Sequence, residues 1–324
     1  MPQKSYGYAA GRVGVLSLSL LSEAALEQLT QAGSVEEAAR LLTDAGWGEA
    51  STRQDIERLC DRHVLDACKT VKELSPEQQT TDCFLIQYDI LNLKTLIKSR
   101  MLGRPDADLS PAGTLDAEKL RRAVAENSYQ DLPPRLKDAM ERIEKRMAMA
   151  PDPLFVDAEL DKAMFAFIQD RLPLVKSPEV RGYFEAKAEL TNLMIALRCA
   201  RLGKNGAFAR DLLVAGGRIP LDAFVHIAEE AESAQSQVAA RPYAAQVLPV
   251  LRGEPVNLPM LEKATDDYLL SLLRPGKYRN DSVLPLIGYL VARQREAGAV
   301  RLIITAKAAR VPAEEIAGRM RRLY

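Results

Sequence analysis

The chain has 324 residues and a mass of 35.8 kDa, which is enough for two or three small domains. Lysine plus arginine and aspartate plus glutamate both number 44, so no global field favours binding to nucleic acid or to an anionic membrane. Aromatic residues make up only 6% of the chain and no run of alternating β-branched residues predicts a strand, so we expect an all-α protein.

The N-terminal region predicts short helices and no membrane span. Its longest nearly uncharged stretch, residues 13–22, is too short to cross a bilayer and lacks the basic region and cleavage site of a signal peptide. Ser34 with Glu37 predicts a helix start closed by a capping box. A further helix begins near Asp55, and on it we expect His63 to be partly buried in a structural role rather than a metal ligand.

The cysteines show no spacing typical of a metal or redox site. None of them forms a C-x-x-C pair, and a disulfide framework would require a different pattern. We therefore expect reduced thiols in a protein of the cytosol at Cys60, Cys68, Cys83 and Cys199.

The first long helix is predicted around FLIQYDILNLKTLIKSRMLG, residues 84–103. Its apolar residues recur at spacings of three and four and so lie on one stripe: Ile86, Ile90, Leu93, Ile97 and Met101. Ser75, followed by a proline and an acid, predicts the helix start. Gly103 predicts its end, and Pro105 would prevent its continuation.

Downstream of it the same order of elements recurs twice. We expect helices over 115–125, 136–148 and 157–171, then a long helix that starts after the N-cap Ser177 and stops at Gly203. The third set comprises 221–240, 244–251, 259–273 and a long helix from Pro285. A Gly216-Gly217 pair occupies the place of Gly113 in the connecting loop.

The long helices carry a common motif. Asp89, Asn92 and Leu93 of the first align with Glu189, Asn192 and Leu193 of the second, and Glu296 holds the acidic place in the third. Ala299 stands where the other two copies have asparagine. We predict one helical repeat used three times, over residues 1–103, 104–205 and 206–324.

The asparagine of the motif has two interpretations. Asparagine is a poor helix residue, yet Asn92 and Asn192 occupy equivalent points. It is either a satisfied polar group that fixes the helix register within each bundle or a contact to a binding partner. Because the third copy has alanine, its role is not required in every repeat.

No catalytic, cofactor or metal site is expected. His63 and His226 are not spaced with the cysteines as metal ligands are. A phosphate-binding G-x-x-x-x-G-K-[ST] loop is absent, and so are the common hydrolase and dinucleotide motifs. The acid pair Asp266-Asp267 is interpreted as a solvated helix face. The basic tail at 319–322 is either a solvated helix end or a dock for an acidic partner.

The motif and its surroundings resemble the C subunit of bacterial and archaeal V-type (A-type) ATPases, the equivalent of the eukaryotic d subunit. The similarity covers essentially the whole chain. It is carried by Tyr88-Asp89-x-x-Asn92-Leu93-Lys94, Glu189-x-x-Asn192-Leu193, Pro285-x-Ile287-Gly288-Tyr289-Leu290, Glu296, Arg321-x-x-Tyr324 and, near the start, Tyr8, Arg12-Val13 and Leu20-Leu21. The chain departs from the family pattern at Ala297 and Ala299.

The resemblance implies a funnel of three similar helical bundles with pseudo-threefold symmetry. It implies a non-catalytic central-stalk (rotor) protein without cofactor, which links the central shaft, made of the D and F subunits, to the membrane rotor ring. Such a protein is cytoplasmic and peripheral on the membrane, with no bilayer insertion of its own. The alternative, from a different class, is a free helical scaffold unrelated to a rotary motor, and finding shaft and ring subunits as partners would exclude it.

Overall fold

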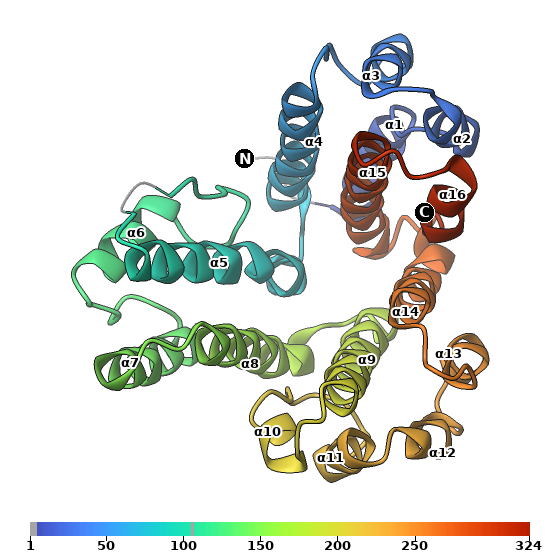
Figure 1. The fold of residues 1–324 in the computed structure, drawn as a ribbon. Helices are drawn as coiled ribbons and strands as arrows, with labels where there is room; N and C mark the ends of the chain where they lie inside the picture. Colours follow the sequence, from blue (N-terminus) through green and yellow to red (C-terminus); the bar gives the residue numbers. More distant parts are fainter. Residues whose placement is uncertain (1–4, 105–106) are drawn as a thin grey trace. The chain divides into compact units, whose positions relative to one another are not determined.

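The computed structural model describes residues 5–104 and 107–324, so Pro105 lies outside the described residues. Every regular element within those ranges is a helix, which confirms the all-α prediction. In chain order the helices of Figure 1 and the three 3₁₀ turns are α1 (Tyr6–Ser17), α2 (Glu23–Gln31), α3 (Val35–Asp44), α4 (Arg53–Leu74), α5 (Gln78–Met101), α6 (Ala117–Ala125), α7 (Pro134–Met149), α8 (Pro153–Arg171), η1 (Leu172–Leu174), α9 (Pro178–Arg201), α10 (Gly206–Arg210), α11 (Leu221–Glu229), η2 (Ala231–Ser233), α12 (Ala234–Val238), α13 (Ala244–Leu251), α14 (Leu258–Leu273), η3 (Arg274–Gly276), α15 (Leu284–Ala308) and α16 (Ala313–Arg319).

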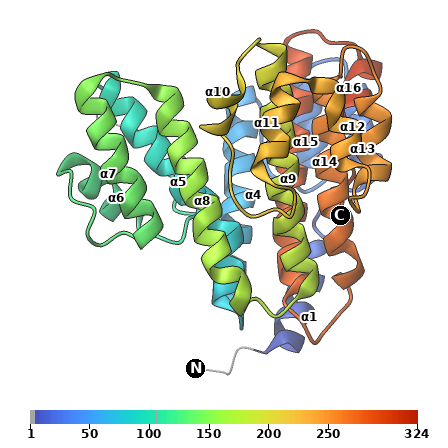
Figure 2. The same ribbon diagram turned by 90° about the horizontal axis from the view of Figure 1, so that it is seen from below.

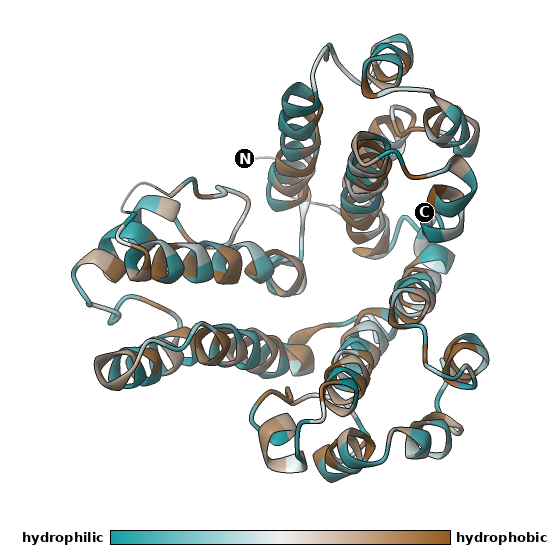
Figure 3. Cartoon of the chain, viewed as in Figure 1, coloured by the Kyte–Doolittle hydropathy of each residue, from teal (hydrophilic) through white to brown (hydrophobic). Residues whose placement is uncertain are grey.

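The helices form two compact units. Unit 1 combines the chain up to Gln78 with Pro259–Tyr324, and unit 2 is Gln79–Leu258. In both, apolar and polar residues share the same helices (Figure 3), as expected for amphipathic helices that bury one side. The division into three repeats at residues 103 and 205 remains a proposal.

Unit 1 is built by the two ends of the chain. α15 packs along α4 and also contacts α1, α2, α3 and α16. Their shared core joins residues from both ends, among them Leu42, Trp47 and Ile56 with Val300 and Ile303. The N-terminal helices therefore complete the bundle around the last long helix. Figure 2 shows α1 near the loop that leads into α15.

Unit 2 contains the other two long helices, α5 and α9. The pairs α7–α8 and α9–α11 pack together, and Lys94 of α5 forms an ion pair with Asp161 of α8 at 2.7 Å. Near their starts, Phe84 of α5 lies against Phe184 of α9, with ring centroids 4.7 Å apart. Aromatic contacts thus hold the two long helices of this unit together.

All three long helices end in the same way. The backbone N–H of the third residue beyond the helix bonds back to a carbonyl in the last turn, from Arg104 to Ser99, from Lys204 to Cys199 and from Val311 to Ala306. This Schellman geometry needs a left-handed residue. Gly103 (φ 65°) and Gly203 (φ 63°) provide it as predicted, whereas α15 uses Arg310 with φ 58°.

These stops give a paired stability prediction. A Cβ at Gly203 would meet nothing within 4 Å, so Gly203→Ala acts through the left-handed backbone alone and should cost about 1 kcal/mol of unfolding free energy. Arg310→Gly should change the stability in the opposite direction by a similar amount. Urea unfolding of both variants tests this, and destabilisation by Arg310→Gly would show that the arginine side chain matters more than its backbone.

Two predicted helix boundaries are wrong. Ser75 does not start the first long helix: it is the C-terminal cap of α4, and α5 begins at Gln78. Ser177 caps α9 as predicted, through a bond from the backbone N–H of Val180. The helix predicted over 221–240 is broken, because Glu230 adopts φ −134° and ψ 85°, which separates α11 from η2 and α12.

Candidate functional site

The acidic residue of the motif in α9 is fully buried and surrounded by donors. Glu189 accepts backbone N–H bonds from Arg218 at 2.7 Å and Ile219 at 3.3 Å. Arg241 binds both carboxylate oxygens at 2.9 Å, and the Tyr243 hydroxyl donates at 2.8 Å. Burial alone would lower the pKa of Arg241, but the bonds and charge of Glu189 raise it above its ordinary value. Burial and the same carboxylate raise the pKa of Tyr243.

Asp89 makes the equivalent contact from α5. Its carboxylate accepts from the backbone N–H and the hydroxyl of Thr114, at 2.6 and 2.7 Å, and from the backbone N–H of Leu115 at 3.0 Å. The loop approaches very closely here. A Cβ on Gly113 would lie 1.9 Å from an Asp89 oxygen, and one on Gly217 would lie 2.4 Å from Cγ of Glu189. Glycine at these two loop positions is therefore required by the acid beside it.

Glu296 does the same in α15, but its loop comes from the other end of the chain. It accepts the backbone N–H of Leu21 at 2.5 Å and is paired with Arg293 at 2.7 Å, both side chains being almost fully buried. Arg293 also donates to the carbonyl of Ser19 at 3.2 Å. Its pKa is lowered by burial and raised more strongly by Glu296, so it stays charged.

The three acids share one geometric role. Each accepts the N–H of the residue immediately before a helix N-cap: Leu21 precedes Ser22 of α2, Leu115 precedes Asp116 of α6, and Ile219 precedes Pro220 of α11. A buried carboxylate in each long helix thus fixes where one short helix begins. A backbone N–H bonded to a charged acceptor is among the stronger hydrogen bonds in proteins.

The asparagines fix the same loops a few residues earlier. Asn92 donates to the carbonyl of Ser110 and accepts its N–H, both at 2.8 Å. Asn192 holds Val214 in the same two-way bond, at 2.8 and 2.9 Å. One side-chain amide therefore replaces the backbone partners that a strand or helix would supply. Beside these amides, Leu93 and Leu193 are fully buried in the core.

The third copy has no asparagine because its loop is helical. The residue at the corresponding place before Leu21 is Leu16, which lies within α1. Its carbonyl already accepts the backbone N–H of Ser19 at 3.2 Å and the Ser19 hydroxyl at 2.8 Å. An amide at position 299 would have no backbone group to bind there, and Ala299 instead packs against the core.

The basic tail and the acid pair of α14 meet each other. The side chain of Arg321 is bonded to Asp266, and the backbone N–H of Arg322 donates to Asp267 at 2.9 Å. The prediction of a solvated face is therefore wrong at Asp267, whose side chain is only 14% exposed, whereas Asp266 keeps 36% of its side chain exposed beside Arg321. His63 has a structural place, with Nε2 2.7 Å from the carbonyl of Trp47.

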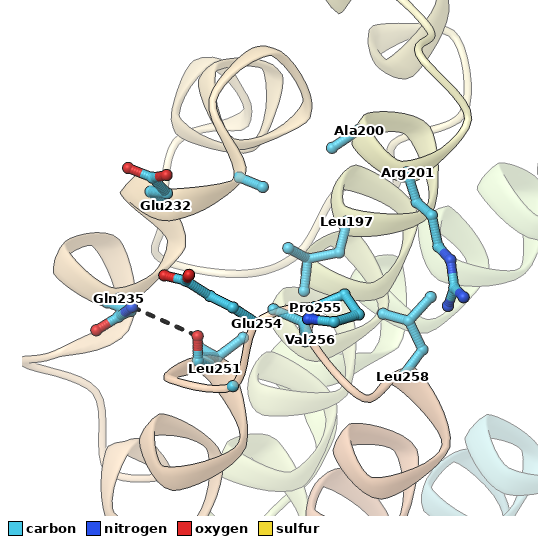
Figure 4. A pocket seen from close by; sticks show the side chains of 12 residues that line it. Leu197, Ala200, Arg201, Glu232, Gln235, Leu251, Glu254, Pro255, Val256 and Leu258 are labelled. Carbon is cyan, nitrogen blue, oxygen red and sulfur yellow. Dashed lines mark hydrogen bonds between the residues drawn. The ribbon is translucent and has the colours of Figure 1, made fainter.

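A pocket in unit 2 offers little chemistry (Figure 4). Its volume is about 280 Å³, and its walls are mainly aliphatic, with Leu197, Leu251 and Val256 among them. Arg201 lies on one side and Glu254 on the other, with no hydroxyl, thiol or imidazole among the lining residues. Over residues 5–104 and 107–324 no group of three His, Cys, Asp or Glu side chains could hold a metal ion.

The thiols are protected in the fold, which predicts a labelling result. All four cysteines are thiols and are buried, and burial raises the pKa of Cys60 and Cys83 to about 12. At pH 8 we expect no thiol to react with a disulfide reagent in the native protein and all to react in denaturant, since only thiolates attack. Rapid labelling of the native protein would contradict this burial.

Sequence reasoning missed the partners of the acids. Arg241 and Tyr243 lie in an irregular segment between α12 and α13, and nothing local marks them as partners of Glu189. Arg293 is three residues before Glu296, a helical pair spacing that could have indicated it.

Comparison of the sequence with known proteins points to one family. The model of the ATP synthase (C/AC39) subunit family matches residues 9–319. The C subunit of the V-type sodium ATPase of Enterococcus hirae is 24% identical over 313 residues, covering 95% of both chains. The C subunit of the A-type ATP synthase of Thermococcus onnurineus is 22% identical over 313 residues, 92% of this chain and 85% of that protein. The C subunit of the V-type ATP synthase of Deinococcus radiodurans is 22% identical over 235 residues, 66% of this chain and 65% of its own length.

Proposed function

Because the chain belongs to the ATP synthase (C/AC39) subunit family, we propose that it is a non-catalytic central-stalk component of a V-type rotary ATPase or ATP synthase. In this role it connects the central shaft, made of the D and F subunits, to the membrane rotor ring and passes torque between them. The observation that carries the proposal is the match over nearly the whole chain, to the family and to relatives that are C subunits of such complexes.

The repeated internal contacts suit a part that bears torque. A long helix resists bending, and a short helix is attached to it both by direct packing and by the loop that leads into the short helix. In each copy that loop is fixed by a buried carboxylate, and in α5 and α9 by an asparagine as well. Motion of the loop relative to the helix would break these buried bonds, each of which is costly to lose. We propose that the three repeats, 1–103, 104–205 and 206–324, surround the shaft as a funnel.

The motif residues act inside the protein under this proposal. Asp89, Glu189 and Glu296 are occupied by backbone N–H groups, with arginine partners for Glu189 and Glu296. They are therefore unsuited to binding shaft or ring directly. The partners are proteins of the complex, not nucleic acid, and the chain lies on the cytoplasmic side, peripheral to the membrane through the ring.

Affinity capture from gently solubilised membranes tests the proposal. A tagged chain should retain shaft and ring subunits together, and the head subunits with them when ATPase complexes stay intact. A free helical scaffold would capture other proteins and none of these. Recovery of the chain without any shaft or ring protein, under conditions that preserve the complex, would overturn the assignment.

A further inference from the structure

Helix α1 exposes large apolar side chains on one face. Tyr8 is 62% exposed, Val15 64% and Leu18, at the helix end, 85%. Their spacing of seven and three residues places them on the same side of a helix. The opposite side packs inward through Ala9 and Val13.

The same face is smooth and extends onto a neighbouring loop. A Cβ added at Gly11 or Gly14 would meet nothing within 4 Å, so another chain can approach the backbone there. At Gly7 the added Cβ would lie 3.9 Å from the carbonyl of Asn280. This brings α1 beside the loop that carries Tyr278, which is 91% exposed. We call Tyr8, Gly11, Gly14, Val15, Leu18 and Tyr278 the α1 face.

The α1 segment is apolar enough to resemble a membrane span but is prevented from forming one. By length and composition Tyr6–Gln31 could cross a membrane, and only 22% of its most apolar stretch is buried. The helix ends at Ser17, and the next residues are held by buried groups of α15: Arg293 binds Ser19 and Glu296 binds Leu21. A continuous helix would leave that buried ion pair without these partners.

The α1 segment itself carries charge of one sign only. Residues 5–22 include no aspartate or glutamate. Arg12 is exposed at the edge of the face and forms no ion pair with any residue that the structure describes. A partner that matches this surface is apolar at its centre and carries carboxylates at its rim.

Other exposed apolar residues lie at helix ends in unit 2. Leu102 and Leu202, 70% and 69% exposed, follow the last residues of α5 and α9, and Met149, 83% exposed, is the last residue of α7. These three are not part of the α1 face, so they provide exposed apolar residues for a control variant.

We propose that the α1 face docks on the cytoplasmic surface of the membrane rotor ring. This inference rests on the proposed function and assigns residues to one of its two contacts. Two observations favour the ring over the shaft: the segment has a composition close to that of membrane-embedded chains, and its unpaired charge is basic. An apolar protein surface at the membrane boundary, edged with carboxylates, is the occupant that complements it.

The test uses membranes that retain the ring but lack this chain. The full wild-type chain should co-sediment with them, and Tyr8→Ser combined with Val15→Ser and Leu18→Ser should weaken binding about tenfold or more. The matched control replaces Leu102, Leu202 and Met149 by serine and should bind like the wild type. Because every replaced side chain is exposed, circular dichroism and capture of the shaft proteins should be unchanged in both variants.

The outcomes separate the inference from the function on which it rests. Wild-type binding with an unaffected α1 variant would overturn the α1 face alone. If the α1 variant loses capture of the shaft proteins but still binds the ring membranes, the α1 face contacts the shaft. That result would also overturn the inference. Equal binding of the wild type to protein-free vesicles of anionic phospholipid would show a lipid surface as the occupant and overturn it too. If the wild type binds neither ring nor shaft, the proposed function itself fails.

Discussion

Replacing Glu189 by glutamine is expected to lower the free energy of unfolding by about 3–5 kcal/mol, because it removes one partner of a buried ion pair. Arg241 would keep its charge without a carboxylate, and the amide would turn a donor toward some of the groups that now donate to Glu189. The measurement is urea unfolding of both proteins, compared at equal m-value.

Glu185 provides the control on the same helix. It also binds Arg218, through the side chain at 2.9 Å, but this pair is partly open to water, with Arg218 70% exposed. Glu185→Gln should therefore cost about 0–1 kcal/mol. A similar, small loss for both variants would mean that Glu189 does not hold the start of α11. Partial recovery in Glu189→Gln with Arg241→Met would identify the stranded arginine as the main cost.

Asn192→Ala is expected to destabilise the protein by about 2–4 kcal/mol, since it leaves both backbone groups of Val214 unpaired. Val214 is fully buried, so water cannot replace the amide. Asn92→Ala should cost less, because Ser110 is only half-buried and its backbone can find water. Thermal and urea unfolding of the two variants measure the difference.

The third copy supplies the control for the asparagines. Ala299→Asn introduces the amide where the corresponding residue, Leu16, is already bonded within and beyond α1. It should give no gain in stability. An increase in stability with Ala299→Asn, or equal losses at positions 92 and 192, would contradict the role assigned to this amide.

The long helices could be predicted because their signals are local. A stripe at spacings of three and four, a serine cap before Pro178 and a glycine stop at Gly203 all lie within the helix or next to it. Arg310 shows the limit of that reasoning: it takes the left-handed position of glycine without any sequence signal. The break at Glu230 was missed for a similar reason, since no glycine or proline interrupts the predicted helix.

The contacts of the motif could not be predicted, because they join segments that are distant along the chain. Glu189 meets Arg241 and Tyr243 across an irregular connection, and Glu296 meets Leu21 from the opposite terminus. The choice between a register-fixing amide and a partner contact at Asn192 required the backbone of Val214 to be located. Ala299 is explained only when α1 is known to be helical at Leu16.

Parallel measurement of ATP hydrolysis and ion transport, in membranes with and without this chain, tests the coupling role most directly. Without the chain, we expect hydrolysis by the soluble head to continue while ATP-driven ion transport is lost, and transport should return when purified chain is added back. Ion transport that survives removal of the chain unchanged would contradict a coupling role.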